Sequence, residues 1–186
     1  MNEKNTLPDE KELVAQLKDE SKRSVAFSVI INRYSEKLYW LIRRMITSHD
    51  DTNDILQNTF LKAWSNIDKF RGDAQISTWL HRIAVNETLN FINKNSENTL
   101  PIDSPEGEIA RNLESDIYFC GNHADALFQE AVSRLPEKQR LVFTMKYFQD
   151  MKYEEISQIV DTSVGALKAS YHLAVKKIET FLQERD

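Results

Sequence analysis

The chain has 186 residues, 41% apolar and 28% charged, with a formal net charge of −5 and only four glycines and four prolines. So few turn-forming residues disfavour a sheet-rich fold and make helix the expected structure. No apolar run reaches the roughly 20 residues of a membrane span, and residues 1–12 lack the apolar core of a signal peptide. The single cysteine, Cys120, has no intrachain partner for a disulfide. Together these features predict a cytoplasmic protein.

The first predicted helices follow an N-terminal segment, residues 1–23. Apolar residues recur in steps of three and four from Phe27 to Met45, which predicts one long amphipathic helix. After Ser48, acidic and capping residues at 50–54 precede an apolar stripe that runs from Ile55 to Trp64. Acidic residues in a first turn favour a helix N-terminus, so a second helix is expected here.

A third helix is expected after the polar, glycine-containing segment 68–73. Ser77 or a neighbour is the expected N-cap, and the helix carries Trp79, Leu80 and Phe91. Trp79 is expected in the core. Three helices joined by short connections predict a compact α-helical domain over residues 24–95.

The next segment, residues 96–122, is predicted to be a flexible linker because it gathers proline, glycine, serine and asparagine. It is also acidic, since residues 96–130 hold eight acidic residues and one basic residue. The flanking parts are only slightly basic, whereas a protein that binds DNA unaided has a strong basic surface. Any DNA binding is therefore expected to depend on a partner.

Residues 123–186 form a second predicted helical domain, in which the stretch Tyr153–Ile178 has the pattern of a helix-turn-helix. Residues 161–163 are a short polar turn, and Ser163 is the expected N-cap of the second helix. The face of that helix opposite its apolar stripe carries short or basic residues that fit a major groove: Gly165, Lys168, Ala169 and His172. An ordinary helical hairpin with a solvated face is the alternative.

The third helix of the first domain has an unusual polar stripe. Arg82, Asn86, Asn90 and Asn93 recur at helical spacing, although asparagine is a poor helix former. Amide groups can read base edges, and Phe70 in its polar loop could stack on an unstacked base. The alternatives are solubility for the asparagines and core packing for Phe70.

No enzyme active site is visible in the sequence. His49, Asp50, Asp51 and Asp54 superficially resemble metal ligands, but acidic residues in a first turn usually complement the helix dipole. Walker, GxSxG and HExxH motifs are absent. We therefore expect no cofactor, no metal and no catalysis.

The ordered motifs "DDTNDILQNTFLKAW", "FRGDAQISTWLHRIAVNETLN" and "LPEKQRLVFTMKYFQDMKYEEISQIVDTSVGALKASYHLAVKKI" cover most of Phe27–Ile178. With this order and spacing the chain resembles the extracytoplasmic-function (ECF) sigma factors of bacterial RNA polymerase. The resemblance implies an all-α fold of two small domains, sigma region 2 and a helix-turn-helix region 4, joined by the acidic linker.

The resemblance also implies partners and contact residues. The helix over Asp50–Trp64 would dock on the clamp helices of the largest subunit of core RNA polymerase, through Asp51, Asp54, Gln57 and Asn58. Capture of a flipped base of the promoter's minus-ten element would fall to Phe70, Arg71, Arg82, Asn86 and Asn90. Binding in the major groove of the minus-thirty-five element would fall to Ser163, Gly165, Lys168, Ala169 and His172. An anti-sigma factor is a further expected partner, because such proteins often have one.

The sequence departs from the family in the predicted DNA-reading helix, where Ser170 and Leu173 stand at positions that commonly hold arginine. Two other functions remain open. A stand-alone helix-turn-helix regulator would explain the C-terminal half but not the asparagine stripe. A structural or sequestering helical protein would leave the helix-turn-helix pattern unexplained.

Overall fold

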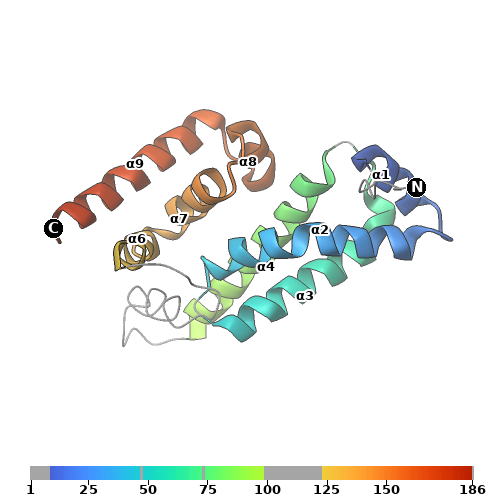
Figure 1. Ribbon diagram of the computed structural model, residues 1–186, viewed down its shortest axis with the longest axis horizontal. Coiled ribbons are helices and arrows are strands. Elements are labelled where there is room, and N and C mark those ends of the chain that lie inside the picture. Colours follow the sequence, from blue (N-terminus) through green and yellow to red (C-terminus); the bar gives the residue numbers. More distant parts are fainter. Residues whose placement is uncertain (1–8, 47, 73, 99–122, 186) are drawn as a thin grey trace, which may run out of the picture.

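A computed structural model describes residues 9–46, 48–72, 74–98 and 123–185, which form helices joined by turns without any strand (Figure 1). The all-α prediction is confirmed. Within the described ranges, no helix has the length and apolar character needed to cross a membrane. Cys120 and nearly all of the expected linker lie outside the described residues.

The first group of helices contains α1 (Glu10–Lys18), α2 (Arg23–Arg43), α3 (His49–Ser65), the short 3₁₀ helix η1 (Ile67–Lys69) and α4 (Ile76–Asn98). The expected long helix is α2, and its apolar steps of three and four are buried. The N-cap of α3 is Ser48, whose hydroxyl accepts a hydrogen bond from the Asp51 N–H at 3.2 Å. Helix α1 was not expected from the sequence.

The start of α4 also differs from expectation. Its first N–H, that of Ile76, donates to the carboxylate of Glu10, 66 residues earlier in the chain. The hydroxyl of Ser77, the expected cap, instead donates to the Gln75 side chain at 3.4 Å. A side chain from α1 therefore satisfies a backbone group that the sequence assigned to a local cap.

The second group contains α6 (His123–Ser133), α7 (Glu137–Phe143), a π-helical turn η2 (Thr144–Phe148), α8 (Tyr153–Val160) and α9 (Val164–Gln183). In Figure 1, α1 and the C-terminal end of α9 lie at opposite ends of the molecule's long axis. The last two helices form the predicted helix-turn-helix. They are connected through a turn short enough for α8 to pack directly on α9.

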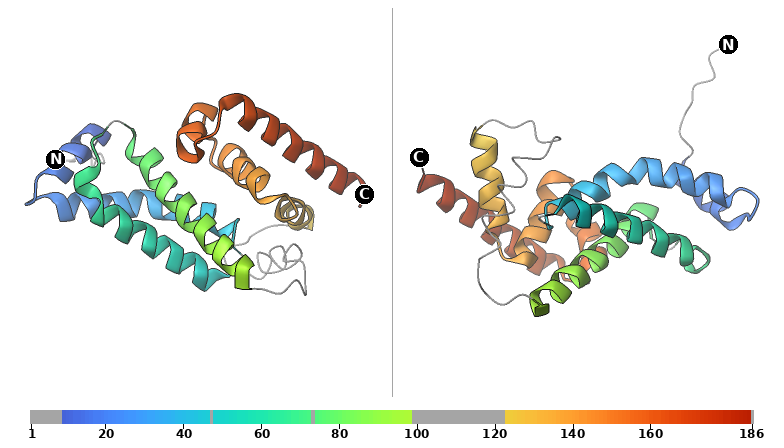
Figure 2. Two further views of the ribbon diagram at one scale, coloured as in Figure 1. Left: turned by 180° about the vertical axis from the view of Figure 1, so that it is seen from behind. Right: turned by 90° about the horizontal axis from the view of Figure 1, so that it is seen from below.

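The two groups of helices meet where α4 packs against α8 (Figure 2). One continuous cluster of buried side chains includes Leu80 and Val85 from α4, Val142 from α7, and Ile156 and Ile159 from α8. The sequence predicted two small domains on a flexible linker, and it gave no indication of this contact. Burial of apolar surface on both sides stabilises the packed arrangement.

Polar side chains add a specific connection to this apolar contact. The Gln149 amide donates to the Lys37 carbonyl at 2.8 Å, and its Oε1 lies 3.0 Å from Nε2 of His81. The His81 ring is 4% exposed, and this burial lowers its pKa, although hydrogen bonds to Ser77 and Gln149 oppose the shift. Nearby, the Arg44 guanidinium lies 3.9 Å from the centre of the Phe148 ring, and burial lowers the pKa of Arg44 to about 10.

Replacing Gln149 with alanine is expected to loosen the contact between the two groups of helices. The variant leaves the Lys37 carbonyl and the His81 ring without these partners. The packed arrangement should lose about 1 to 3 kcal/mol of stability, which raises the ratio of separated to packed molecules roughly 5- to 150-fold. Small-angle X-ray scattering should show a larger radius of gyration. The matched control is Gln158→Ala on the exposed face of α8. Equal radii for the two variants would contradict this role of Gln149.

Candidate functional site

The polar stripe of α4 lies at the surface. Arg82, Asn86 and Asn90 are exposed on one side of the helix, whereas Leu80 and Val85 are buried. None of the three contributes to the apolar core. Their side chains are therefore accessible to a binding partner.

A cleft of about 340 Å³ lies beside this stripe, between the end of α3, η1 and α4. Its lining combines an aromatic ring, amides, ammonium groups, one carboxylate and one aliphatic side chain, and consists of Lys62, Asn66, Lys69, Trp79, Ile83, Asn86 and Glu87. The Lys69 ammonium donates to the Asn66 side chain at 3.1 Å, and the Lys62 ammonium lies 2.5 Å from the Glu87 carboxylate. Such groups suit a nucleobase, which can stack and hydrogen-bond, and its neighbouring phosphate.

The two aromatic residues next to the cleft differ from expectation, since Phe70 is buried and Trp79 packs against the core with only part of its side chain. Phe70 is 9% exposed and belongs to the core, which is the alternative that the sequence left open for it. Its ring packs against Trp79, with the ring centres 4.7 Å apart and the planes 31° from parallel. Trp79, expected in the core, is half-buried and lines the cleft. Phe70 therefore supports the indole, and the neighbouring Arg71 is exposed.

The turn between α8 and α9 has the predicted geometry. Asp161 ends α8 in the left-handed conformation, with φ 51°, which aspartate adopts more readily than most residues. The Ser163 hydroxyl accepts a hydrogen bond from the Ala166 N–H at 3.3 Å, so Ser163 is the N-cap of α9 as expected. A Cβ added at Gly165 would meet nothing within 4 Å. No neighbour within the described chain requires glycine there.

The predicted reading face of α9 is exposed. Its members Ser163, Gly165, Lys168, Ala169 and His172 are all accessible, whereas Leu167, Ala174 and Ile178 are buried on the other side. Leu173, one of the two positions where the family commonly has arginine, is 48% exposed.

A second lysine joins this face from another element. The ammonium of Lys168 lies 5.8 Å from the centre of the Tyr153 ring, and the ammonium of Lys146, in η2, lies 5.5 Å from the same ring. Lys146 also donates to the Met151 carbonyl at 3.1 Å and pairs with the Asp150 carboxylate at 3.8 Å. Both ammonium groups thus lie near Tyr153 at the start of the helix-turn-helix, and linear spacing did not indicate the contribution of Lys146.

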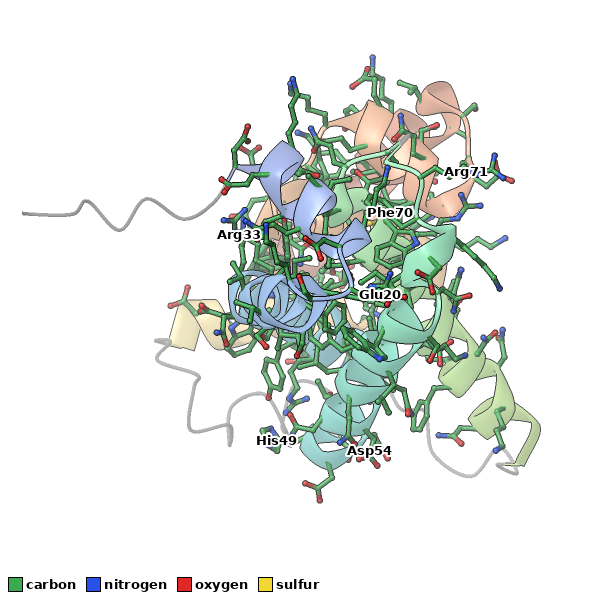
Figure 3. All side chains as sticks on the ribbon, turned by 90° about the vertical axis from the view of Figure 1, so that its right-hand side faces the viewer. Glu20, Arg33, His49, Asp54, Phe70 and Arg71 are labelled. Atoms are coloured by element: carbon green, nitrogen blue, oxygen red, sulfur yellow. The ribbon has the colours of Figure 1, made fainter. Side chains whose placement is uncertain are left out.

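Helix α3 presents the residues predicted to contact polymerase. Asp54, Gln57 and Asn58 are exposed, and Asp51 is half-buried. Figure 3 shows Asp54 near the opposite end of α3 from Phe70 and Arg71. Farther along the same helix, Leu61 is 58% exposed and Trp64 is 41% exposed. The sequence placed Trp64 in the buried stripe, whereas the structure leaves part of it at the surface, against the Phe27 ring at 5.0 Å between ring centres.

Comparisons with known proteins agree with this division into two functional parts. The family model described as sigma-70 region 2 matches residues 30–97, and that described as sigma-70 region 4 matches residues 125–178. The ECF RNA polymerase sigma-E factor of Salmonella typhimurium LT2 is 30% identical over 168 residues, 85% of this chain and 87% of the relative. This chain belongs to the ECF RNA polymerase sigma factors. The sigma-E factor of Haemophilus influenzae is 28% identical over 167 residues, 85% of this chain and 88% of that relative.

Solved structures share the fold of this sigma factor. CnrH, in complex with the cytosolic domain of CnrY, has a TM-score of 0.72 at 21% identity, covering 95% of this chain and 99% of CnrH. The sigma factor RpoE of Bartonella quintana, in complex with the anti-sigma factor NepR, has a TM-score of 0.68 at 19% identity, covering 84% of this chain and 96% of RpoE. At these identities the likeness concerns the fold.

The family matches also locate the sites along the sigma factor. The cleft beside Asn86 lies in the region 2 match, and the exposed face of α9 lies in the region 4 match. Helix α1 precedes both matches.

Truncation of Phe70 tests its position in the core. We expect Phe70→Ala to lower the free energy of unfolding by about 3 to 5 kcal/mol, because the change leaves a cavity behind Trp79. The control is Arg71→Ala, which is exposed and should change stability by less than about 0.5 kcal/mol. Denaturant titration of both variants gives the comparison, and similar midpoints would place Phe70 outside the core.

Proposed function

We propose that this sigma factor binds core RNA polymerase in the cytoplasm and directs promoter recognition, strand opening and transcription initiation, without catalysing a reaction itself. The observation that carries the proposal is the cleft of about 340 Å³ in which Trp79 and Asn86 lie beside two lysines. A cleft of this kind can hold a base that has left the duplex. The helix-turn-helix in the same chain supplies a second DNA contact.

Strand opening needs a site that compensates for unstacking. Extruding a base costs a few kcal/mol, which stacking on an aromatic ring and hydrogen bonds to the base edge can offset. In the proposed site the Trp79 indole provides the stacking surface, Phe70 holds the indole from behind, and Asn86 reads the base edge. Lys69 lies at the same cleft and would meet the adjoining phosphate.

Recognition of the minus-thirty-five element is assigned to the exposed face of α9. Lys168 and Lys146, gathered around Tyr153, would contact phosphates, and the short side chains of Gly165 and Ala169 would let the helix approach the base edges. Ser170 and Leu173 replace two positive charges found commonly in the family. The affinity of this helix for DNA is therefore low without polymerase.

Polymerase docking is assigned to α3. The polar contacts to the clamp helices come from Asp54, Gln57 and Asn58, with Asp51 at the beginning of the helix. The exposed Leu61 and Trp64 add an apolar anchor of the kind found at the centre of protein interfaces. An anti-sigma factor is a further proposed partner, because RpoE of Bartonella quintana is solved with the anti-sigma factor NepR.

The packed arrangement described above is a closed state under this proposal. The minus-ten and minus-thirty-five elements lie about 25 base pairs apart, on the order of 85 Å along the duplex at about 3.4 Å per base pair. Helices α4 and α8 are in direct contact, so the two DNA-binding parts have to separate before they can engage both elements. A second cleft of about 310 Å³, lined by Asn86 and Ser170 from either side, would open in that step.

A stand-alone helix-turn-helix regulator is the alternative function. It accounts for α8 and α9, but it gives no role to the exposed apolar residues of α3 or to the cleft beside Asn86. Transcription from a defined promoter, with and without core polymerase, separates the two. A regulator would bind its site tightly without polymerase at physiological salt, whereas a sigma factor would not.

Charge reversal on α3 tests the docking surface. Asp54→Lys is expected to weaken binding to core polymerase roughly tenfold or more, while the fold stays intact because the side chain is exposed. Glu179→Lys makes the same change of charge at an exposed position near the C-terminal end of α9, beyond the residues assigned to DNA, and serves as the control. Fluorescence anisotropy with labelled protein measures both affinities. Equal affinities would mean that the docking surface lies elsewhere.

Replacement of Asn86 tests the base contact. Asn86→Ala removes an exposed amide and no core volume, so the protein should fold, bind core polymerase and bind the duplex promoter normally. It should nevertheless open the minus-ten region poorly, which permanganate footprinting detects as weaker reactivity of unpaired thymines. Opening at the wild-type rate would show that the base is held elsewhere and that the asparagine stripe only solvates the helix.

A further inference from the structure

The loop between η1 and α4 carries Phe70 and Arg71 and leads directly into Trp79, and both of its ends are attached to the N-terminal helices. Before the loop, Asp68 forms an ion pair with Arg23 at 2.8 Å, and the Arg23 Nε–H donates to the Leu17 carbonyl of α1 at 2.9 Å. After the loop, the Ile76 N–H donates to the Glu10 carboxylate. The loop is thus bracketed by contacts to residues more than 40 positions away.

Glu10 occupies a position that strengthens the start of α4. The first N–H groups of a helix have no partner within the helix, and negative charge at that end is favourable. Glu10 supplies both an acceptor and a charge there. Glu10 is half-buried, and its charge is, after burial, the second cause that raises the pKa of the buried Tyr34.

Helix α1 is docked on the first group of helices through buried side chains. Leu13 and Leu17 are 0% and 3% exposed and belong to the core of the first group of helices. Gly72, in the loop, adopts φ 83°, and a Cβ at this position would lie 3.5 Å from a methyl carbon of Val14. Figure 3 shows α1 beside the loop that carries Phe70 and Arg71. The loop therefore rests on α1.

We propose that Glu10 is a positioning residue for strand opening: from α1 it fixes the first turn of α4 and so places Trp79 at the cleft beside Asn86. Trp79 lies in that first turn, where its N–H donates to the Gln75 carbonyl at 3.0 Å. Fraying of the turn would move the indole away from Asn86, one of the residues that share the cleft with it. The inference rests on the proposed function, and it extends the opening machinery to a helix outside both family matches.

Three variants of the full chain, each bound to core polymerase, test this role. Glu10→Ala removes the acceptor and the charge. Glu10→Gln keeps an acceptor. Glu12→Ala is the matched control, because Glu12 is an exposed carboxylate two residues away whose contact is with Gln16 of the same helix. Opening of a duplex promoter is followed with permanganate, and initiation is measured on a second template whose minus-ten region is already unpaired.

Glu10→Ala is expected to open the duplex about 2- to 30-fold more slowly, the range that corresponds to loss of a helix cap. Its initiation on the unpaired template and its affinity for core polymerase should stay near wild type. Glu10→Gln should recover most of the opening rate, and Glu12→Ala should match wild type. A Glu10→Ala rate equal to that of Glu12→Ala overturns the proposal, as does an equal loss on both templates, which would indicate general misfolding.

Asn86→Ala, measured in parallel, separates this inference from the proposed function. If Asn86→Ala opens slowly and Glu10→Ala opens normally, the base contact stands and the positioning role is wrong. If Asn86→Ala opens normally and Glu10→Ala opens slowly, the positioning role stands and another residue reads the base. If both open normally, both assignments are wrong.

Discussion

The packing of α4 between α3 on one side and α8 on the other leaves only a narrow part of its surface for polar residues. Leu80 and Val85 are buried in one core with residues from both neighbouring helices. Even the hydroxyl of Thr88 is turned inward and donates to the Ala84 carbonyl at 2.8 Å. Asn86 lies on the remaining polar strip, and for this reason it borders both clefts, one on each side of α4.

Under the proposed function, DNA binding is coupled to the packing of the two groups of helices. A promoter that needs the two groups apart binds only the separated form of the protein. The free energy that holds α4 against α8 therefore lowers the apparent affinity for the promoter, because that affinity falls with the fraction of separated molecules. Core polymerase can supply the missing free energy by binding the separated form more tightly. Weak DNA binding by the free protein then follows both from its low positive charge and from this competition.

The sequence predicted elements whose determinants are local. Apolar spacing predicted α2 and α3, and Ser163 predicted the start of α9, because periodicity and capping act within a few residues. Helix α1 was missed since its buried stripe is short, with Leu13 and Leu17 as its buried members.

Contacts between distant residues left no local pattern. Gln149 and Lys37 are 112 positions apart, and Glu10 and Ile76 are 66 apart. Phe70 and Trp79 are both large aromatic residues, so only three-dimensional packing shows that Phe70 supports the Trp79 ring and that Trp79 lines the cleft. The exposed position of Trp64 was missed for a similar reason, because an apolar residue at helical spacing is usually buried.

The π-helical turn η2 sets the rotation of the following chain relative to α7, and so affects the contact between the two groups of helices without affecting the turn between α8 and α9. A π turn holds one more residue than an α turn, so the same residues wound as a regular α-helix would rotate the chain beyond this turn by one residue, about 100°, relative to α7. Gln149 and Phe148 would then point away from Lys37 and Arg44, while the turn between α8 and α9 would keep its internal geometry. The extra residue in η2 therefore determines how the second group of helices meets the first, and it leaves the geometry of α9 itself unchanged.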